Sequence, residues 1–431
     1  MSSKTLILGF TGLACLAGAG LLRQNSPPPQ EPVMAIQQAW RAHQSPLSEA
    51  LSESETARPA PSSSPLPSAS ATASATPVPS GSPSASPSPT PSPAPAGSAS
   101  PTPFPAASTP QELHQKAIVV DTHVETPFLI SEKNVRLRSN SGQVSLDKLR
   151  EGGVDVVFFS IYVNPYKYKD QPRSQAEKII GLLRKEIDAN ADLIELATSH
   201  ADIQRIVAAG KIAGLMGMEG ADPIGESLNN IDHFYKLGVR YLGPTWSTHT
   251  LMGDSSGPPK PRWNGLSKFG KMAVERMNQL GMLIDVSHLS DAAFKDVLTL
   301  SKQPVIASHS AVDGVRNHAR NFSDDMLKLL ALNGGVTGIV FYGPFLDASG
   351  KADLKRVVDH IDHAVKVGGI DHVGLGSDFD GLDLPPPTGL EDARRFPAIT
   401  AELKARGYSN ADVYKILGAN FMRVFAQVLK D

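Results

Sequence analysis

Five side chains of types that commonly bind metal ions follow apolar, strand-like segments of the sequence. They are His123, Glu125, Glu219, His288 and His309. A carboxylate or imidazole at the end of a buried strand is poor core material, because desolvating it without a partner is unfavourable by several kcal/mol. Such residues become suitable ligands if all the strands end at one face of a barrel.

The pattern around each residue indicates how two metal ions could share the set. His123 and Glu125 alternate along one strand end, so both side chains point to the same side. Glu219 lies in the segment GMEG, whose glycines let the backbone turn closely around the carboxylate. A carboxylate can bridge two cations, whereas an imidazole cannot. With His288 and His309, the mixed nitrogen and oxygen donors suit Zn²⁺ and predict a two-metal hydrolase.

The elements that must position these residues are short apolar segments separated by helical patterns. Most of the segments are nearly continuous runs of Val, Ile, Leu and Gly, as expected of parallel strands covered on both faces. Eight of them fit an α/β fold of the (β/α)8 TIM-like barrel type found in metal-dependent hydrolases. An open, doubly wound sheet is the alternative, but it gives no reason for polar residues at nearly every strand end. The eight segments are 117–121, 154–163, 213–218, 239–246, 282–288, 304–309, 335–341 and 372–378.

Composition narrows the function classes and divides the chain. The net charge is −2, so no broad basic field predicts a nucleic-acid partner. Residues 1–24 predict a signal peptide or membrane anchor, with Lys4 before an apolar run. Cys15, the only cysteine, leaves open whether this segment is cleaved, lipidated or retained. Residues 25–110 predict a Pro/Ser/Ala-rich disordered linker and residues 111–431 the barrel domain. We therefore expect an exported, extracytoplasmic protein, periplasmic or attached to the cell envelope.

Several other signals do not support a different chemistry. Residues 253–257 match G-x-S-x-G, but prolines rather than a helix follow, which argues against a serine hydrolase. The sequence contains no H-E-x-x-H, the motif of common single-zinc peptidases. His360 and His363 lie three residues apart on a predicted helix, and a solvated face is the expected explanation.

Longer segments of the sequence resemble one known protein family. The chain resembles the membrane dipeptidase (renal dipeptidase-like) family of dinuclear zinc peptidases, in order over nearly all of residues 117–425. The segments that carry the resemblance are VDTHVETP, GLMGMEGADPI, GVRYLGPTWSTHT, GLSKFGKMAVERMNQLGMLIDVSHLSD, PVIASHS, HARNFSDD, VGLGSDFDG and ILGANFMRVF.

The resemblance implies a complete ligand set. His123 and Glu125 would hold the first zinc ion, and His288 and His309 the second. Glu219 would bridge the two Zn²⁺ ions together with a hydroxide or water, which would attack the scissile bond of a small dipeptide.

The resemblance also implies roles for three residues outside the ligand set. His249 would stabilise the oxyanion and contact the substrate, Arg320 would bind the substrate's C-terminal carboxylate, and Asp378 would shuttle the proton. Glu125 departs from the family pattern, which usually has Asp at this position. With no cysteines in residues 111–431, any homodimer would be noncovalent.

Two other functions stay open on the sequence. The same two-metal site could act on another small amide or ester, such as a lactam or lactone, because barrel loops can be directed at different substrates. A noncatalytic binding protein attached to the envelope is the second alternative. The presence of His249, Asp378 and all five ligands argues against it.

Overall fold

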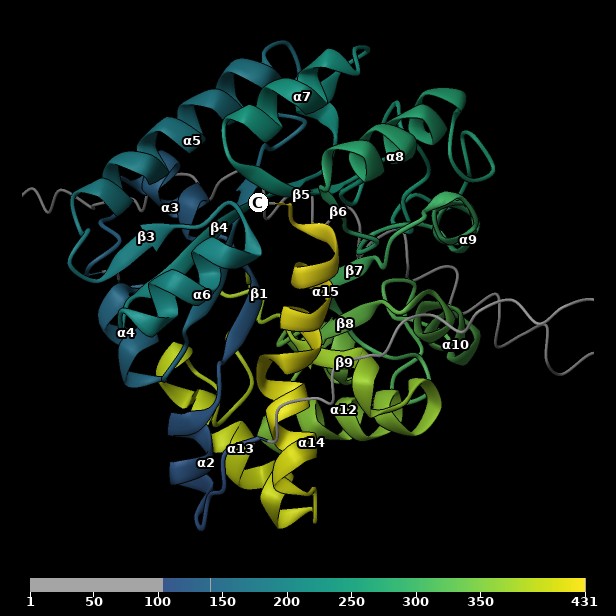
Figure 1. Cartoon of the computed structure of the whole chain (residues 1–431). Coiled ribbons are helices and arrows are strands. Elements are labelled where there is room, and N and C mark those ends of the chain that lie inside the picture. The colour runs from purple at the N-terminus through teal and green to yellow at the C-terminus, as the bar shows by residue number, and fades with distance from the viewer. Residues whose placement is uncertain (1–103, 140, 431) are drawn as a thin grey trace, which may run out of the picture. The chain divides into compact units, whose positions relative to one another are not determined.

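Nine parallel strands form the centre of the described structure. The computed structural model describes residues 104–139 and 141–430. Figure 1 shows helices around the outside of these strands. The strands are β1 (Val120–Val124), β2 (Val156–Tyr162), β3 (Ile194–Leu196), β4 (Ile212–Glu219), β5 (Val239–Gly243), β6 (Leu283–Ile284), β7 (Ile306–Ser310), β8 (Val336–Ile339) and β9 (Val373–Leu375).

Eight of the strands close into a ring. Hydrogen bonding between neighbouring strands gives two sheets, with the strand order β1-β2-β4-β5-β6 in one and β7-β8-β9 in the other. The backbone N–H of Val286 donates to the Ile306 carbonyl (2.8 Å) and joins the end of β6 to β7. The N–H of Glu125 donates to the Phe379 carbonyl (2.8 Å) and joins the end of β1 to the residues after β9. The (β/α)8 barrel predicted from the sequence is therefore confirmed, and the open-sheet alternative is wrong.

Each predicted apolar segment overlaps one barrel strand, whereas β3 was not predicted. Its three residues pair with Ile212–Gly214, the first part of β4, while β5 pairs with the later part from Met216. Such a short strand has no periodic pattern that a sequence reading could recognise.

Helices follow most of the strands and cover the ring. Serine side chains cap the helices before and after β6: Ser267 accepts from the N–H of Gly270 (3.0 Å) and Ser290 from that of Ala293 (3.3 Å). The helices are α2 (Pro110–Lys116), α3 (Thr126–Lys133), α4 (Leu146–Glu151), α5 (Pro172–Asp188), α6 (His200–Ala208), α7 (Asn229–Lys236), α8 (Lys268–Leu280), α9 (Asp291–Leu300), α10 (Asp324–Asn333), α11 (Gly343–Leu346), α12 (Leu354–Gly368), α13 (Phe396–Ala405), α14 (Asn410–Tyr414) and α15 (Asn420–Val428).

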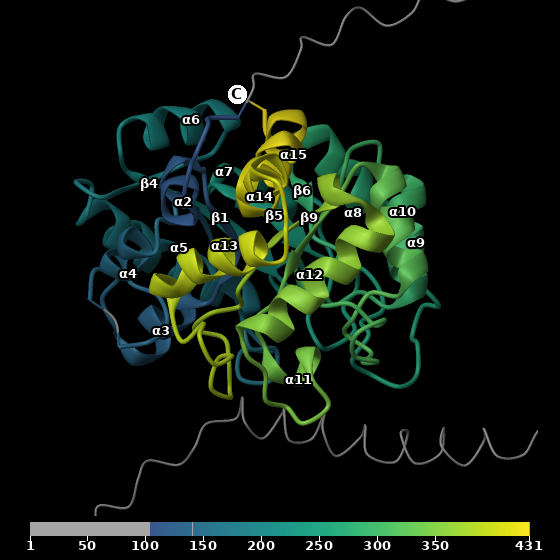
Figure 2. The same ribbon diagram turned by 90° about the horizontal axis from the view of Figure 1, so that it is seen from below.

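The amino ends of the strands are covered by α15. Phe421 and Phe425 of this helix belong to one buried apolar cluster with the first residues of several strands, among them Val120, Val156 and Val336. Figure 2 shows α15 and α11, the helix after β8, on opposite sides of the strands. One end of the barrel is thus filled by apolar side chains, which leaves the carboxyl ends of the strands for polar residues.

The described part of the chain begins before the predicted start of the barrel domain at residue 111. The ring of Phe104 stacks on that of Tyr414 in α14 (5.1 Å between centroids), and Asn410 donates to the carbonyl of Ala107 (2.8 Å). The predicted signal or anchor, 1–24, and residues 25–103 of the predicted linker lie outside the described residues. Among the helices of the described part, none is long and apolar enough to cross a membrane.

Candidate metal centre

The five predicted metal ligands come from the carboxyl ends of four strands. His123 lies in β1, Glu219 is the last residue of β4 and His309 lies in β7. Glu125 directly follows β1, and His288 follows β6 by four residues. All five side chains are buried. The barrel therefore brings together residues that are separated by up to 186 positions in the sequence.

The carboxylate of Glu219 lies between two groups of ligands. Its Oε2 is 3.3 Å from Nε2 of His123, and its Oε1 is 2.9 Å from Nε2 of His288 and 3.6 Å from Nε2 of His309. Ligand atoms within 4.8 Å of one another form one group of His123, Glu125 and Glu219 and a second of Glu219, His288 and His309. This is the division that a bridging carboxylate requires.

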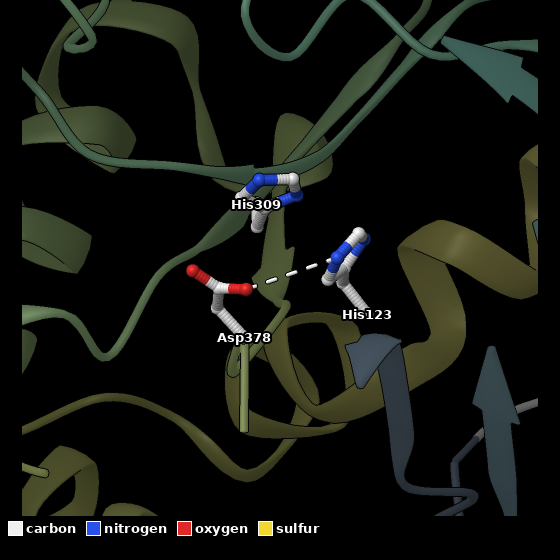
Figure 3. A group of neighbouring side chains, drawn as sticks. All are labelled: His123, His309 and Asp378. Atoms are coloured by element: carbon white, nitrogen blue, oxygen red, sulfur yellow. Dashed lines mark ion pairs between the residues drawn. The ribbon is translucent and has the colours of Figure 1, made fainter. Parts of the chain in front are cut away.

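A third group overlaps the other two. Asp378 lies with His123 and His309, and its Oδ1 is 3.8 Å from Nε2 of His123. Figure 3 shows the Asp378 carboxylate and the His123 ring facing one another, with His309 beside them. The two imidazole rings are 3.9 Å apart between centroids. Asp378 is therefore adjacent to both ligand groups.

The protonation states of Glu219, His288 and His309 favour cation binding, whereas at His123 the Glu219 charge outweighs burial and raises the pKa above 6.5. Burial opposes ionisation of Glu219, but His123 and His288 outweigh it and hold the pKa of Glu219 well below its usual value. Burial lowers the pKa of His309 well below 6.5, and burial followed by the Arg320 charge lowers the pKa of His288 to about 4. An ionised carboxylate and neutral imidazoles are the forms that bind metal ions.

The hydrogen bonding of the ligands points to the same conclusion. Nε2 of His123 is buried and makes no hydrogen bond with any described residue. The Nε2 atoms of His288 and His309 lie 2.9 Å apart, so at most one of them can donate when both rings are neutral. Burial and then the Glu219 charge raise the pKa of Glu125 well above 4.5. A cation would satisfy the nitrogen lone pairs and offset the repulsion between the carboxylates, so these residues fit a metal site.

Asp378 and Asp380, which follow β9, differ in their surroundings. Burial raises the pKa of the Asp378 carboxyl to about 7. Asp380 instead joins loops, because it accepts from the Thr126 hydroxyl (2.7 Å) and from the Gln143 N–H (2.6 Å). Asp378 is suited to exchange a proton near neutral pH, whereas Asp380 holds the loops around it.

Arg320 is a buried cation near the two groups. Only 3% of its surface is exposed, and burial lowers the pKa of its guanidinium to about 10. Its Nη2 donates to the His309 carbonyl (3.2 Å), and the guanidinium lies over the Phe345 ring at 5.4 Å. Its Nε has no hydrogen-bond partner in the described part of the chain. An anionic ligand would provide the missing acceptor.

His249 makes its hydrogen bonds within its own loop. Its Nε2 hydrogen-bonds the carbonyl of Lys260 (2.8 Å), and its Nδ1 accepts from the N–H of Ser255 (3.1 Å) and lies 3.3 Å from Asp254. It belongs to none of the three groups of candidate ligands. The predicted role of this residue at the oxyanion stays a prediction.

Polar residues behind the ligands were missed from the sequence. Asp285, Ser308 and Tyr241 are buried and contact the ligand histidines or one another. Their only signal in the sequence was a polar residue inside an otherwise apolar segment, as in MLIDVSH and PVIASHS. That signal does not distinguish a partner of a ligand from a residue that bonds only the backbone.

The expected solvated face for His360 is wrong. His360 is 0% exposed, and its ring hydrogen-bonds the N–H of Val312 (3.1 Å) and the carbonyl of Leu346 (2.9 Å). His363 lies 2.6 Å from an oxygen of Asp324. Neither histidine belongs to a group of candidate metal ligands in the described residues.

Comparisons with known proteins agree on one family. The family model described as membrane dipeptidase (peptidase family M19) matches residues 108–430. Dipeptidase verJ of Clonostachys rogersoniana is 35% identical over 331 residues, which cover 72% of this chain and 84% of the relative.

Solved structures give the same result. The probable dipeptidase PvdM of Pseudomonas aeruginosa has a TM-score of 0.69 and 30% identity over 74% of this chain and 97% of its own. A metallopeptidase of Rhodobacter sphaeroides, liganded with a phosphinate mimic of the dipeptide L-Ala-D-Ala, has a TM-score of 0.67 and 29% identity, covering 72% of this chain and 99% of its own.

Proposed function

Because the chain belongs to the membrane dipeptidase family, peptidase family M19, we propose that it hydrolyses dipeptides at a site for two zinc ions. The family makes the chain a metal-dependent hydrolase, and the number and kind of ions are our proposal. The observation that carries it is the position of Glu219, whose two oxygens face different histidines at 3.3 Å and 2.9 Å.

The proposed ligands divide between the two ions. His123 and Glu125 would hold one, His288 and His309 would hold the other, and Glu219 would be shared by both. Two bound zinc ions would lower the pKa of a water molecule towards neutrality and polarise the scissile carbonyl. The chain supplies two neutral imidazoles, His288 and His309, and the ionised carboxylate of Glu219 for this purpose.

Asp378 is proposed to carry the proton from the attacking water to the leaving amine. Its carboxylate lies 3.8 Å from His123, and the third group of neighbouring side chains includes it with His123 and His309. Burial raises the pKa of Asp378 to about 7. A group with a pKa near the working pH both accepts and releases a proton readily, which general acid–base catalysis requires.

Arg320 is proposed to bind the C-terminal carboxylate of the substrate. A guanidinium can donate two parallel hydrogen bonds to a carboxylate, and that pairing is strongest away from water. Arg320 is buried and its Nε lacks a protein acceptor among the described residues. Recognition of a free carboxylate here favours short peptides with an exposed C-terminus over protein chains.

His249 is proposed to donate to the oxyanion only after its Nε2 leaves the Lys260 carbonyl. A change in the loop that contains both residues would be needed.

The experiment combines metal analysis with a substrate panel. Protein purified without chelator is expected to contain about two zinc equivalents per chain, one for each ligand group. It should hydrolyse dipeptides, lose activity with chelator and regain it with added zinc. Activity on lactams or esters but not dipeptides would favour the alternative substrates. One zinc equivalent that is lost in His288→Ala and unaffected in His123→Ala would contradict a bridged pair.

Export and assembly are proposed on the sequence alone. The apolar segment 1–24 and the linker 25–110 support an extracytoplasmic location, with attachment to a membrane if the segment is retained. A homodimer of the barrel domain, if it forms, is noncovalent, because residues 111–431 contain no cysteine.

A further inference from the structure

The hydroxyl of Ser308 lies at the centre of a buried polar cluster behind the metal ligands. Its Oγ is 2.6 Å from Oδ2 of Asp285 and 2.8 Å from Nδ1 of His309. It is 3.4 Å from Nδ1 of His123. Ser308 is 0% exposed and Asp285 is 1% exposed. One serine therefore contacts a histidine from each ligand group without being a ligand itself.

The hydrogen-bonding capacity of each group fixes the directions of these bonds. Oδ1 of Asp285 accepts from the N–H groups of Ser287 (3.0 Å) and Ser308 (2.8 Å). Oδ2 accepts from the Ser308 hydroxyl (2.6 Å). A hydroxyl has only one hydrogen, so Ser308 must accept from His309, whose ring hydrogen therefore lies on Nδ1.

The histidine of the other ligand group lies beside the same serine. Ser308 Oγ, whose one hydrogen goes to Asp285, is 3.4 Å from Nδ1 of His123 and can only accept from it. The Tyr241 hydroxyl lies 2.8 Å from the same nitrogen. A hydrogen on Nδ1 of each ring leaves Nε2 as the ring nitrogen that faces Glu219, at 3.3 Å for His123 and 3.6 Å for His309.

We propose that Asp285, acting through Ser308, is a positioning residue that keeps the ring hydrogens of His309 and His123 on Nδ1 and so presents Nε2 of each ring to the metal ions. The proposal rests on the two-zinc function proposed above. In this arrangement the Asp285 carboxylate links the two ligand groups, on the side of the imidazole rings that faces away from Glu219. Hydrogen-bond partners of this kind orient metal-binding histidines and commonly affect metal affinity by 10- to 100-fold.

Asp285→Asn is the most informative change, because it keeps the shape and alters only the hydrogen-bonding pattern. The amide oxygen is expected at the position of Oδ1, where two N–H groups donate. The NH₂ group then faces Ser308 and donates to it. This frees the Ser308 hydroxyl hydrogen to donate to Nδ1 of His309, which would move the ring hydrogen to Nε2 and block the metal-binding nitrogen.

The first test measures zinc affinity of the full-length protein by competition with a chromophoric chelator. We expect Ser308→Ala to bind zinc about 10-fold or more weakly and Asp285→Asn to be affected at least as much. Ser310→Ala is the matched control, because Ser310 is also 0% exposed and flanks His309, but its hydroxyl has no partner among the described residues. Wild-type affinity in Ser308→Ala, or an equal loss in Ser310→Ala, would overturn the proposal.

The second test reads the position of the ring hydrogen directly. In protein with ¹⁵N-labelled histidine, the nitrogen shifts of His309 should report hydrogen on Nδ1 in the wild type and on Nε2 in metal-free Asp285→Asn. The double variant Asp285→Asn/Ser308→Ala should recover part of the lost zinc affinity, since the serine that donates to Nδ1 is gone. An unchanged ring hydrogen in Asp285→Asn, or an additive loss in the double variant, contradicts the proposal.

The two tests separate this inference from the proposed function. Absence of zinc binding by the wild-type protein would refute the two-zinc function. The position of the His309 ring hydrogen is measured without metal and without substrate, so it still decides whether Asp285 and Ser308 act as proposed.

Discussion

At the scale of single residues, unusual backbone conformations are concentrated at the candidate site. His288, Asp378 and Asp380 have φ angles of 68°, 63° and 66°, although none is a glycine. Left-handed backbone at such residues costs about 1–3 kcal/mol each and persists only where the surrounding structure imposes it. At His288 and Asp378 the turn directs the side chain towards the ligand groups. Two of the strained residues are therefore ones to which we assign a role at the metal site.

Glu125 is the residue at which the resemblance predicts a departure from the family pattern. A Cβ at Gly381 would lie 2.9 Å from Cδ of Glu125, so the glycine leaves room for the longer side chain. We therefore expect Glu125→Asp to weaken zinc binding, by about 10-fold, because the shorter carboxylate no longer reaches an ion held by His123 and Glu219. Zinc titration of metal-free protein, followed by dipeptide hydrolysis, measures the change.

Glu151→Asp is the control for this substitution, because Glu151 is exposed and belongs to none of the groups of candidate ligands. Tighter zinc binding and faster turnover in Glu125→Asp would show that the natural glutamate weakens the first zinc site and that its surroundings have not adapted to it.

Asp378 provides a second prediction at this scale. Asp378→Asn should retain zinc and lower kcat by about 100-fold or more with little change in KM, because a proton carrier acts in the transition state. Metal content and steady-state kinetics of the same preparation check this. Loss of zinc from the variant would instead make Asp378 a ligand, a role that its position beside His123 and His309 also allows.

At the scale of secondary-structure elements, loops depend on side chains from helices that lie far from them in the sequence. His360 of α12 joins the loop after β7 to the end of α11 through its bonds to Val312 and Leu346. Burial lowers the pKa of His360 to about 4, so its ring is neutral in the folded protein at neutral pH. The same loop after β7 carries Arg320, so α12 helps to position the proposed carboxylate-binding residue.

The buried state of His360 predicts a pH dependence of stability. Its pKa falls from 6.5 in the unfolded chain to about 4 in the folded one. Below pH 6.5 His360 binds a proton in the unfolded chain, whereas in the folded protein its ring stays neutral down to about pH 4. The stability present above pH 6.5 should therefore decrease between pH 6.5 and 4, by about 3 kcal/mol in total.

His360→Gln tests this dependence, because glutamine keeps one donor and one acceptor but does not titrate. Urea unfolding at several pH values should show a shallower loss of stability below pH 6.5 in the variant. The free energy of unfolding at pH 8 gives the baseline for any change in packing. An identical slope in both proteins would mean that His360 does not titrate as its burial indicates.

At the scale of the whole molecule, the two ends of the barrel have opposite character. Phe421 and Phe425 of α15 fill one end, whereas the ligand groups occupy the other. Glu125, Glu219 and Asp378 lie close together there, and their mutual charge contributes to the raised pKa values of Glu125 and Asp378. The apolar end is stabilised by packing of its side chains, whereas the ligand end is expected to depend on bound cations.

Metal removal should therefore destabilise the whole barrel. An ion that binds only the folded chain adds about 4 kcal/mol of stability when its free concentration is 1,000 times Kd. We expect chelator to lower Tm measurably and added zinc to restore it. His288→Ala should show a smaller drop with chelator, because one ligand group is already incomplete. A Tm that is independent of chelator in zinc-loaded wild-type protein would contradict a metal-dependent fold.

The sequence alone was sufficient to predict where the eight barrel strands lie and which five residues are candidate ligands. A buried parallel strand is a short, continuous apolar segment, and a ligand at its carboxyl end is a polar residue in the next few positions. Both features are local, so neither requires knowledge of distant residues. The resemblance of longer segments to one family then assigned roles to Arg320, Asp378 and His249.

Only the tertiary structure decided which distant residues meet. Closure of the ring depends on contacts between Val286 and Ile306 and between Glu125 and Phe379, neither of which leaves a local pattern. The bond between His123 and Tyr241 joins residues 118 positions apart. Burial of His360 and the bonds of His249 within its loop follow likewise from packing. Hydrogen bonds are satisfied by whatever the fold brings near, so their partners cannot be read from spacing along the chain.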